Sequence, residues 1–203
     1  MRKLSSFPYS GGKFYMLNDI IEIFSHGGMT TVVDVFEGSG KFLLNADAEV
    51  KVYNDIDSRF VNLFLVIKER PEAFSDRFRY SIHSRQLFNR YLLEPETGDA
   101  VEDAYRFLYI LNPAFKSRNV TVRPTFGYSL KTNRTQTADV ILRNFDVLHS
   151  EIRKWTIEYL DFRELMKKYD SPFTFFYLDP LTTTYKGTSI ISTTLTLLAL
   201  LKY

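Results

Sequence analysis

The chain of 203 residues contains no cysteine. Disulfide bonds and thiolate-ligated metal sites are therefore excluded. Its three histidines, His26, His83 and His149, are far apart in the sequence and match no spacing typical of a zinc site. We therefore expect no metal.

Long apolar runs are also missing. No stretch reaches the roughly 18 apolar residues that a membrane-spanning helix needs, and residues 1–6 lack the apolar core of a secretion signal. Hydrophobic residues make up 45% of the chain and charged residues 25%, which is ordinary for a globular protein. These proportions predict a cytoplasmic protein without membrane contacts, of one domain or of one domain carrying a large insertion.

Acidic residues are absent from residues 104–138, although basic and aromatic residues alternate there. Net charge is only +2, so any affinity for nucleic acid must come from such local clustering. Basic side chains neutralise phosphates, while aromatic rings stack on bases. The alternative is a solvated basic face over an aromatic core. Residues 106–110 are expected to be mostly a core helix. Nucleic-acid contact is expected from Lys116, Arg118, Arg123, Tyr128, Lys131 and Arg134.

The most informative stretch is the short β-branched run at residues 32–35 (Val-Val-Asp-Val), which is followed by Phe36 and a Gly-x-Gly turn at Gly38 and Gly40. A helical pattern follows the turn. A buried strand, a glycine turn and a helix are typical of the start of a nucleotide-binding α/β domain. The turn alone is also compatible with an ordinary tight turn.

Acidic residues follow the other predicted strands. Asp55 comes after the second strand, where such folds bind the two hydroxyls of a ribose. Asp161 and Asp179 follow the third and fourth strands. Because the carboxyl ends of parallel strands share one edge of a sheet, we expect these acids and Gly38 to lie close together. The later strands are expected at residues 50–53, 155–160 and 173–178.

Helical periodicity predicts helices at residues 14–24, 58–68 and 162–168, and Pro71 is expected to end the second of these. The apolar faces are Leu17, Ile20, Ile21 and Phe24 in the first helix and Phe60, Leu63, Phe64 and Ile67 in the second. Residues 70–150 interrupt the alternation of strands and helices, which predicts an inserted and mostly helical lobe.

Several motifs together resemble one enzyme family. Residues 36–40 (Phe-Glu-Gly-Ser-Gly) resemble the Phe-x-Gly-x-Gly motif of S-adenosylmethionine-dependent methyltransferases. Residues 8–13 (Pro-Tyr-Ser-Gly-Gly-Lys) resemble the Pro-x-x-Gly-Gly-Lys start of the Dam-type DNA adenine-N6 methyltransferases. Residues 106–109, 161–162 and 177–180 follow in the order of that family. The resemblance covers roughly residues 6–180.

The resemblance implies a Rossmann-like α/β methyltransferase fold with a DNA-recognition insertion at residues 66–150. Residues 1–65 and 151–203 would form the catalytic domain. The resemblance also implies that Asp161 accepts from the adenine amine of the cofactor, although Asp161 equally suits a helix N-cap. Residues 11–13 are alternatively a loop before a helix. The implied cofactor-binding residues are Tyr9, Gly12, Lys13, Phe36, Gly38, Ser39, Gly40, Asp55, Ile56, Asp161 and Phe162.

Catalysis is implied for Asp179 and Pro180, which match the first half of the Asp-Pro-Pro-Tyr motif of the family. Leu181 and Thr182 depart from its second half. The motif resemblance stops there, and we expect the C-terminal strands of the fold to be missing. A true variant, a truncation and a shifted reading frame remain open as explanations, and weak or absent turnover is expected.

The sequence therefore predicts a site-specific enzyme of bacterial, archaeal or phage type that methylates adenine N6 in double-stranded DNA, as in restriction–modification systems. S-Adenosylmethionine is the expected methyl donor. Two alternatives remain: an inactive remnant that binds DNA or cofactor, and a methyltransferase that acts on RNA.

Overall fold

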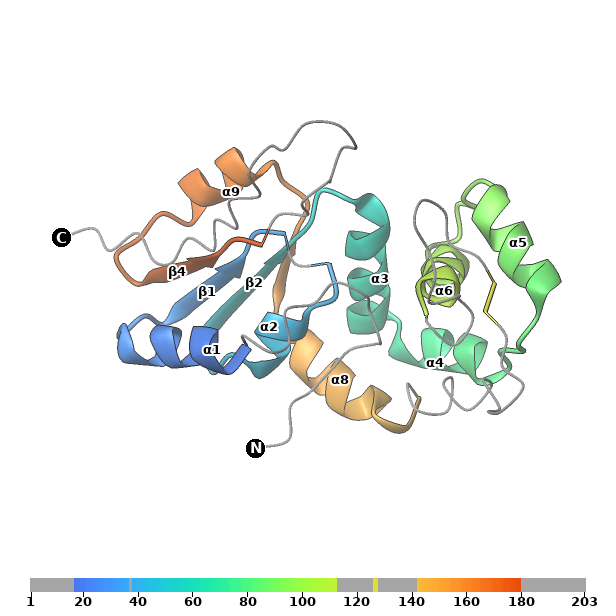
Figure 1. The fold of residues 1–203 in the computed structure, drawn as a ribbon, viewed down its shortest axis with the longest axis horizontal. Coiled ribbons are helices and arrows are strands. Elements are labelled where there is room, and N and C mark those ends of the chain that lie inside the picture. Colours follow the sequence, from blue (N-terminus) through green and yellow to red (C-terminus); the bar gives the residue numbers. More distant parts are fainter. Residues whose placement is uncertain (1–16, 37, 113–125, 128–141, 180–203) are drawn as a thin grey trace.

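A sheet of four parallel strands forms the centre of the computed structural model, which describes residues 17–36, 38–112, 126–127 and 142–179 (Figure 1). The strand order is β3-β2-β1-β4. The chain runs outward from β1 to β3 and then returns to the other side of β1 as β4. Open α/β sheets bind ligands at such a reversal of strand order, beyond the carboxyl ends of the strands, here β1 and β4. The strands are β1 (Thr31–Asp34), β2 (Val50–Asn54), β3 (Thr156–Glu158) and β4 (Thr174–Tyr177).

Both faces of the sheet are apolar and covered, as a parallel sheet requires. Adjacent strand residues face opposite sides, so Val32 and Val33 belong to separate hydrophobic clusters. The larger cluster includes residues of α1 (Leu17–His26) and α2 (Lys41–Asn45). On the other face α9 (Phe162–Lys168) contributes Leu165 to the smaller cluster (Figure 1).

The predicted apolar face of α1 is confirmed for Leu17, Ile20 and Phe24, which are buried, whereas Ile21 is half-buried. The next predicted helix is α3 (Ser58–Glu69), and all four residues of its expected face are buried. Asp57 starts α3 as its N-cap, because its carboxylate accepts from the Arg59 backbone N–H.

Pro71 separates two helices. α3 ends at Glu69, as expected, but Pro71 also begins α4 (Pro71–Arg79) at once. The first helical position has no use for a backbone N–H, so proline fits it well. The start of α4 at Pro71, directly after α3, was not predicted from the sequence.

Helices α4, α5 (Arg85–Leu93) and α6 (Ala100–Leu111) lie beyond α3, away from the sheet (Figure 1). α6 packs on α3 through an edge-to-face contact between Phe107 and Phe60, whose ring centroids are 4.8 Å apart. Its residues Phe107, Leu108 and Tyr109 are buried, so the expectation of a core helix at residues 106–110 is confirmed. No helix in the described ranges is long and apolar enough to cross a membrane.

The chain returns to the sheet through α8 (Phe145–Ile152). β3 and β4 are shorter than predicted: β3 stops at Glu158 instead of residue 160. The reason is a side chain, because both backbone polar groups of Leu160 bond to the Asn54 amide instead of continuing the ladder.

Candidate functional site

Four acidic residues lie at or just beyond the carboxyl ends of the four strands. Asp34 ends β1 and Asp55 follows β2, while Asp161 and Asp179 come shortly after β3 and β4. Since all four strands are parallel, these residues gather at one edge of the sheet. The predicted convergence of Gly38, Asp55, Asp161 and Asp179 therefore agrees with the observed topology.

The glycine turn after β1 needs its glycines for two different reasons. Gly38 and Gly40 have φ values of 54° and 73°, which strain any other L-residue. Gly40 is also crowded, because a Cβ there would lie 3.0 Å from the rings of Phe64 and Trp155. A Cβ at Gly38 would lie 3.9 Å from the Phe60 ring, an ordinary contact distance. The turn is therefore packed more tightly on the core at Gly40 than at Gly38.

Asp55 holds the glycine turn to the end of β2. Its Oδ2 accepts from the Gly38 backbone N–H at 2.9 Å, and its Oδ1 accepts from the Asp57 backbone N–H at 2.8 Å. Burial raises the pKa of Asp55, and these two backbone N–H groups offset part of that rise. Each carboxylate oxygen keeps acceptor capacity beyond one hydrogen bond.

Tyr53 fixes the other side of the same glycine. Its hydroxyl donates to the Gly38 carbonyl oxygen at 3.0 Å, and its ring stacks on Trp155 with centroids 6.0 Å apart. Both peptide groups of Gly38 are thus tied to β2. Of the other predicted turn residues, Ser39 is buried and Phe36 is half-buried.

Asp161 and Phe162 start α9. Asp161 is its N-cap: Oδ1 accepts from the Arg163 backbone N–H at 2.9 Å, and the carboxylate also pairs with the Arg163 guanidinium. That side-chain hydrogen bond lowers the pKa of Asp161. Phe162 is 41% exposed, and its ring lies 5.9 Å from that of Phe36. The alternative of an N-cap is thus confirmed for Asp161, and Phe162 meets the segment after β1.

Two further predicted residues lie at the same edge. Ile56 follows Asp55 and is 63% exposed, which is unusual for an isoleucine beside a buried strand. Asp179 is half-buried, and its Oδ2 lies 3.4 Å from the Tyr177 hydroxyl, at the long limit of a hydrogen bond. Pro180, Leu181 and Thr182 lie outside the described residues.

Asp34 is a further acidic residue at this edge, and it was not among the residues predicted from the sequence. It is 1% exposed, and neither carboxylate oxygen accepts a hydrogen bond of normal geometry from the described residues. Burial raises its pKa well above the usual value; the Phe36 backbone N–H opposes this slightly, and the nearby charges of Asp179 and Asp55 add to it. An acid inside a run of valines, at residues 32–35, was the available sequence signal.

The remaining predicted residues lie outside the described ranges. These are Tyr9, Gly12 and Lys13 for the cofactor and Lys116, Arg118, Arg123, Tyr128, Lys131 and Arg134 for nucleic acid.

Phe126 and Gly127, in the middle of the basic stretch, are described. The Phe126 ring packs on His83 at 4.5 Å and on Phe88 of α5 at 5.8 Å, and His83 Nε2 is 3.0 Å from the Gly127 carbonyl oxygen. Phe126 and Gly127 therefore contact the region around α5.

A cavity of about 540 Å³ lies between α3, α5 and α6 and contains none of the predicted site residues. Its charged lining is mostly paired internally: Arg106 bonds to Glu94 and Glu102, and Arg59 bonds to Asp57. No group of three or more His, Asp or Glu residues in the described ranges is placed to hold a metal ion.

The edge of the sheet formed by the carboxyl ends of the strands, called the sheet edge below, suits a cationic ligand with an apolar ring. Asp34 offers a buried carboxyl group without a partner in the described ranges, and Asp55 accepts only backbone hydrogen bonds there. Ile56 and Phe162 expose apolar surface after adjacent strands. A ligand cation would compensate the acidic end, and a planar ring would cover the apolar end.

Comparison with known proteins shows which family the chain resembles in sequence. Residues 9–194 match the family model of the D12 class N6 adenine-specific DNA methyltransferases, so the match extends beyond Pro180. The modification methylase StsI of Streptococcus sanguinis is 31% identical over 67 residues, covering 33% of this chain and 10% of that protein. The aligned part therefore spans about a tenth of the length of that relative.

Proposed function

Because the chain belongs to the D12 class N6 adenine-specific DNA methyltransferases, we propose that it transfers a methyl group from S-adenosylmethionine to adenine N6 in duplex DNA. One observation carries the proposal: the glycine turn, Asp55 and Asp179 meet at the carboxyl edge of one parallel sheet. Members of this class use S-adenosylmethionine as the methyl donor.

In this proposal the acidic residues of the edge bind the ribose and the methionine end of the cofactor, and the apolar residues contact its adenine ring. Asp55 accepts from the ribose hydroxyls with the acceptor capacity that its two backbone hydrogen bonds leave. Asp34, buried next to the turn, would compensate the charge of the ammonium group at the methionine end. Ile56 and Phe162 pack against the adenine ring, and Asp161 accepts from its amine. Tyr9, Gly12, Lys13, Phe36, Ser39 and the two turn glycines complete the proposed site.

Asp179 and Pro180 act on the target base. When bound, the cofactor supplies a methyl group on a positively charged sulfur. Asp179 accepts one N–H of the adenine amine, so that the nitrogen lone pair is directed at the methyl carbon. Pro180 stiffens the chain after Asp179. The target base must leave the duplex to reach this edge.

DNA recognition belongs to the inserted region in this proposal. The position of α4, α5 and α6 beyond α3 supports a separate lobe (Figure 1). The expected boundaries at residues 65/66 and 150/151 fall inside α3 and α8, so divisions after Glu69 and before Phe145 suit the helices better. The proposed DNA contacts remain Lys116, Arg118, Arg123, Tyr128, Lys131 and Arg134. Action in the cytoplasm of a bacterium, an archaeon or a phage-infected cell belongs to the same proposal.

An inactive binding remnant is the second candidate, favoured by Leu181 and Thr182 in place of the proline and tyrosine of the motif. Transfer of a labelled methyl group from S-adenosylmethionine tests both candidates. Slow labelling of adenine N6 in duplex DNA, lost in Asp179→Ala, supports the enzyme. Cofactor binding by calorimetry without any transfer supports the remnant, and transfer to RNA alone would replace the substrate.

A further inference from the structure

Asn54, the last residue of β2, makes three hydrogen bonds through one buried side chain. It is 1% exposed. Its Nδ2 donates to the Val35 carbonyl at 3.0 Å and to the Leu160 carbonyl at 3.2 Å, and its Oδ1 accepts from the Leu160 N–H at 2.9 Å. The Leu160 N–H can bond only to an acceptor, which fixes the orientation of the amide.

These bonds join two segments that the sheet does not connect. Val35 follows β1 and Leu160 follows β3, with β2 between them. The β1–β2 ladder ends at Asp34 and Tyr53, and the β2–β3 ladder ends at Asn54 and Glu158. The Val35 carbonyl and both polar groups of Leu160 therefore depend on Asn54.

The two joined residues come directly before the two halves of the proposed cofactor site. Val35 precedes Phe36 and the glycine turn, and Leu160 precedes Asp161 and Phe162. The rings of Phe36 and Phe162 meet at 5.9 Å just past the anchored residues. A shift of either segment at Asn54 would therefore change the distance across the site.

We propose that Asn54 is a positioning residue that fixes the glycine turn relative to Asp161 and Phe162 and thereby determines cofactor affinity, an inference that rests on the proposed function. Only an amide supplies both two donor hydrogens and an acceptor at this length. An ionised aspartate lacks the donors, and leucine lacks every polar group.

The test compares Asn54→Asp and Asn54→Leu with the parent chain, using calorimetric titration with S-adenosylhomocysteine under conditions where circular dichroism shows each protein folded. Asn62→Ala is the control, because Asn62 donates to the Ala100 carbonyl at 2.9 Å between α3 and α6. The Kd should rise about tenfold in both Asn54 variants at neutral pH and stay unchanged in the control.

Acidic pH separates positioning from general damage. Once protonated, the carboxyl group introduced by Asn54→Asp can again donate to one carbonyl and accept from Leu160, so the Kd of this variant should return toward that of the parent. Asn54→Leu should not recover. Asp34, Asp55 and Asp161 also change protonation with pH, both in the parent and in the variants. The ratio of variant Kd to parent Kd is therefore compared at each pH.

Parent-like Kd values in both Asn54 variants, with only lower thermal stability, would overturn the inference. If the parent binds no S-adenosylhomocysteine, the proposed function fails, and amide hydrogen exchange then decides the positioning role. Faster exchange in Asn54→Leu confined to the backbone around Val35 and Leu160 would support that role, and unchanged exchange there would overturn it.

Discussion

At the end of β1, Asp34 places a carboxyl group in a fully buried position without a hydrogen-bond partner in the described ranges. Its pKa is raised mainly by burial. A raised folded-state pKa makes the folded protein hold the proton longer than the unfolded chain does. The contribution of Asp34 to stability is therefore greatest below the unfolded pKa of about 3.9 and is lost as pH rises through the folded value.

Asp34→Asn should consequently stabilise the ligand-free protein, because the amide stays neutral at every pH. The parent must instead bury an ionised carboxylate, or hold a proton, at neutral pH. The gain near pH 7 should be on the order of 1 kcal/mol or more and should vanish near pH 3. Thermal melts of variant and parent across pH measure it. A gain that is independent of pH would show that ionisation of Asp34 is not its cause.

Asp55→Ala should weaken binding of S-adenosylhomocysteine, because it removes the acceptor of the ribose hydroxyls and the anchor of the Gly38 N–H. Hydrogen bonds to a charged group contribute about 1.5–3 kcal/mol each, so the Kd should rise more than tenfold. Calorimetric titration measures the change, with Asn62→Ala as the control. An unchanged Kd would remove Asp55 from the cofactor site.

Acidic residues just beyond the strands were predictable from the sequence, and the last residues of the strands themselves were not. Asp55 and Asp161 follow apolar runs, so their place at the edge follows from the topology. Asp34 and Asn54 belong to strands, and their importance depends on partners that are present or missing in three dimensions. Periodicity along one strand carries no information about those partners.

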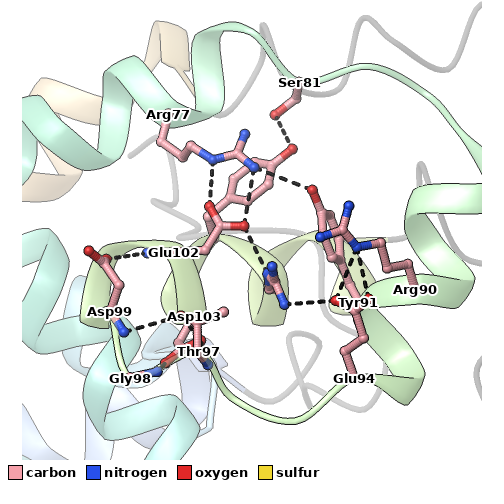
Figure 2. A network of polar contacts seen from close by, with 12 residues as sticks. Arg77, Ser81, Arg90, Tyr91, Glu94, Thr97, Gly98, Asp99, Glu102 and Asp103 are labelled. Atoms are coloured by element: carbon pink, nitrogen blue, oxygen red, sulfur yellow. Dashed lines mark hydrogen bonds and ion pairs between the residues drawn. The ribbon is translucent and has the colours of Figure 1, made fainter.

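At the scale of helices, a polar network holds α4, α5 and α6 together (Figure 2). Arg77 of α4 and Arg106 of α6 both donate to the Glu102 carboxylate, at 2.7 and 2.8 Å. Arg106 also pairs with Glu94 at the end of α5. Burial alone would raise the pKa of Glu102, but the hydrogen bonds from Arg77 and Arg106 lower it overall.

Glu102→Gln should destabilise this group of helices at neutral pH, because two guanidinium groups lose their shared carboxylate. A lowered folded pKa means that the contribution is present above the unfolded pKa of about 4.3 and is lost as pH falls below it. The site is partly exposed, so we expect only about 1 kcal/mol. Urea denaturation at pH 7 and pH 3 measures it; equal losses at both pH values would contradict the ionic explanation.

Phe126→Ala should lower the affinity for duplex DNA about tenfold, because Phe126 lies close in sequence to the proposed DNA contacts Arg123 and Tyr128 and the substitution removes its contacts with His83 and Phe88. Fluorescence anisotropy with labelled duplex measures the DNA affinity. The Kd for S-adenosylhomocysteine should not change. Unaltered DNA affinity would place the DNA contacts away from Phe126.

The existence of the helices was predictable from apolar periodicity, but their ends were less so. The four-residue apolar face defined α3, whereas its final turn and the immediate start of α4 depended on Pro71 acting at both helices. β3 ended early because Asn54, a residue of another strand, captured the backbone of Leu160. Such long-range competition for backbone groups has no local sequence signal.

At the scale of the whole molecule, the described residues offer two places for the ligand. The sheet edge joins the segments that follow all four strands, and a cavity of about 540 Å³ lies between α3, α5 and α6. The acidic edge suits the cationic cofactor, whereas both arginines of the cavity lining, Arg59 and Arg106, are paired with acidic side chains. We therefore assign the cofactor to the sheet edge.

Hydrogen exchange of the entire chain with and without S-adenosylhomocysteine tests this assignment most directly. We predict that the ligand slows exchange in the segments that directly follow the four strands, around Gly38, Asp55, Asp161 and Asp179. Exchange in α5 and α6 should change little. Protection concentrated around Tyr91 and the cavity wall, with none at the sheet edge, would contradict the assignment.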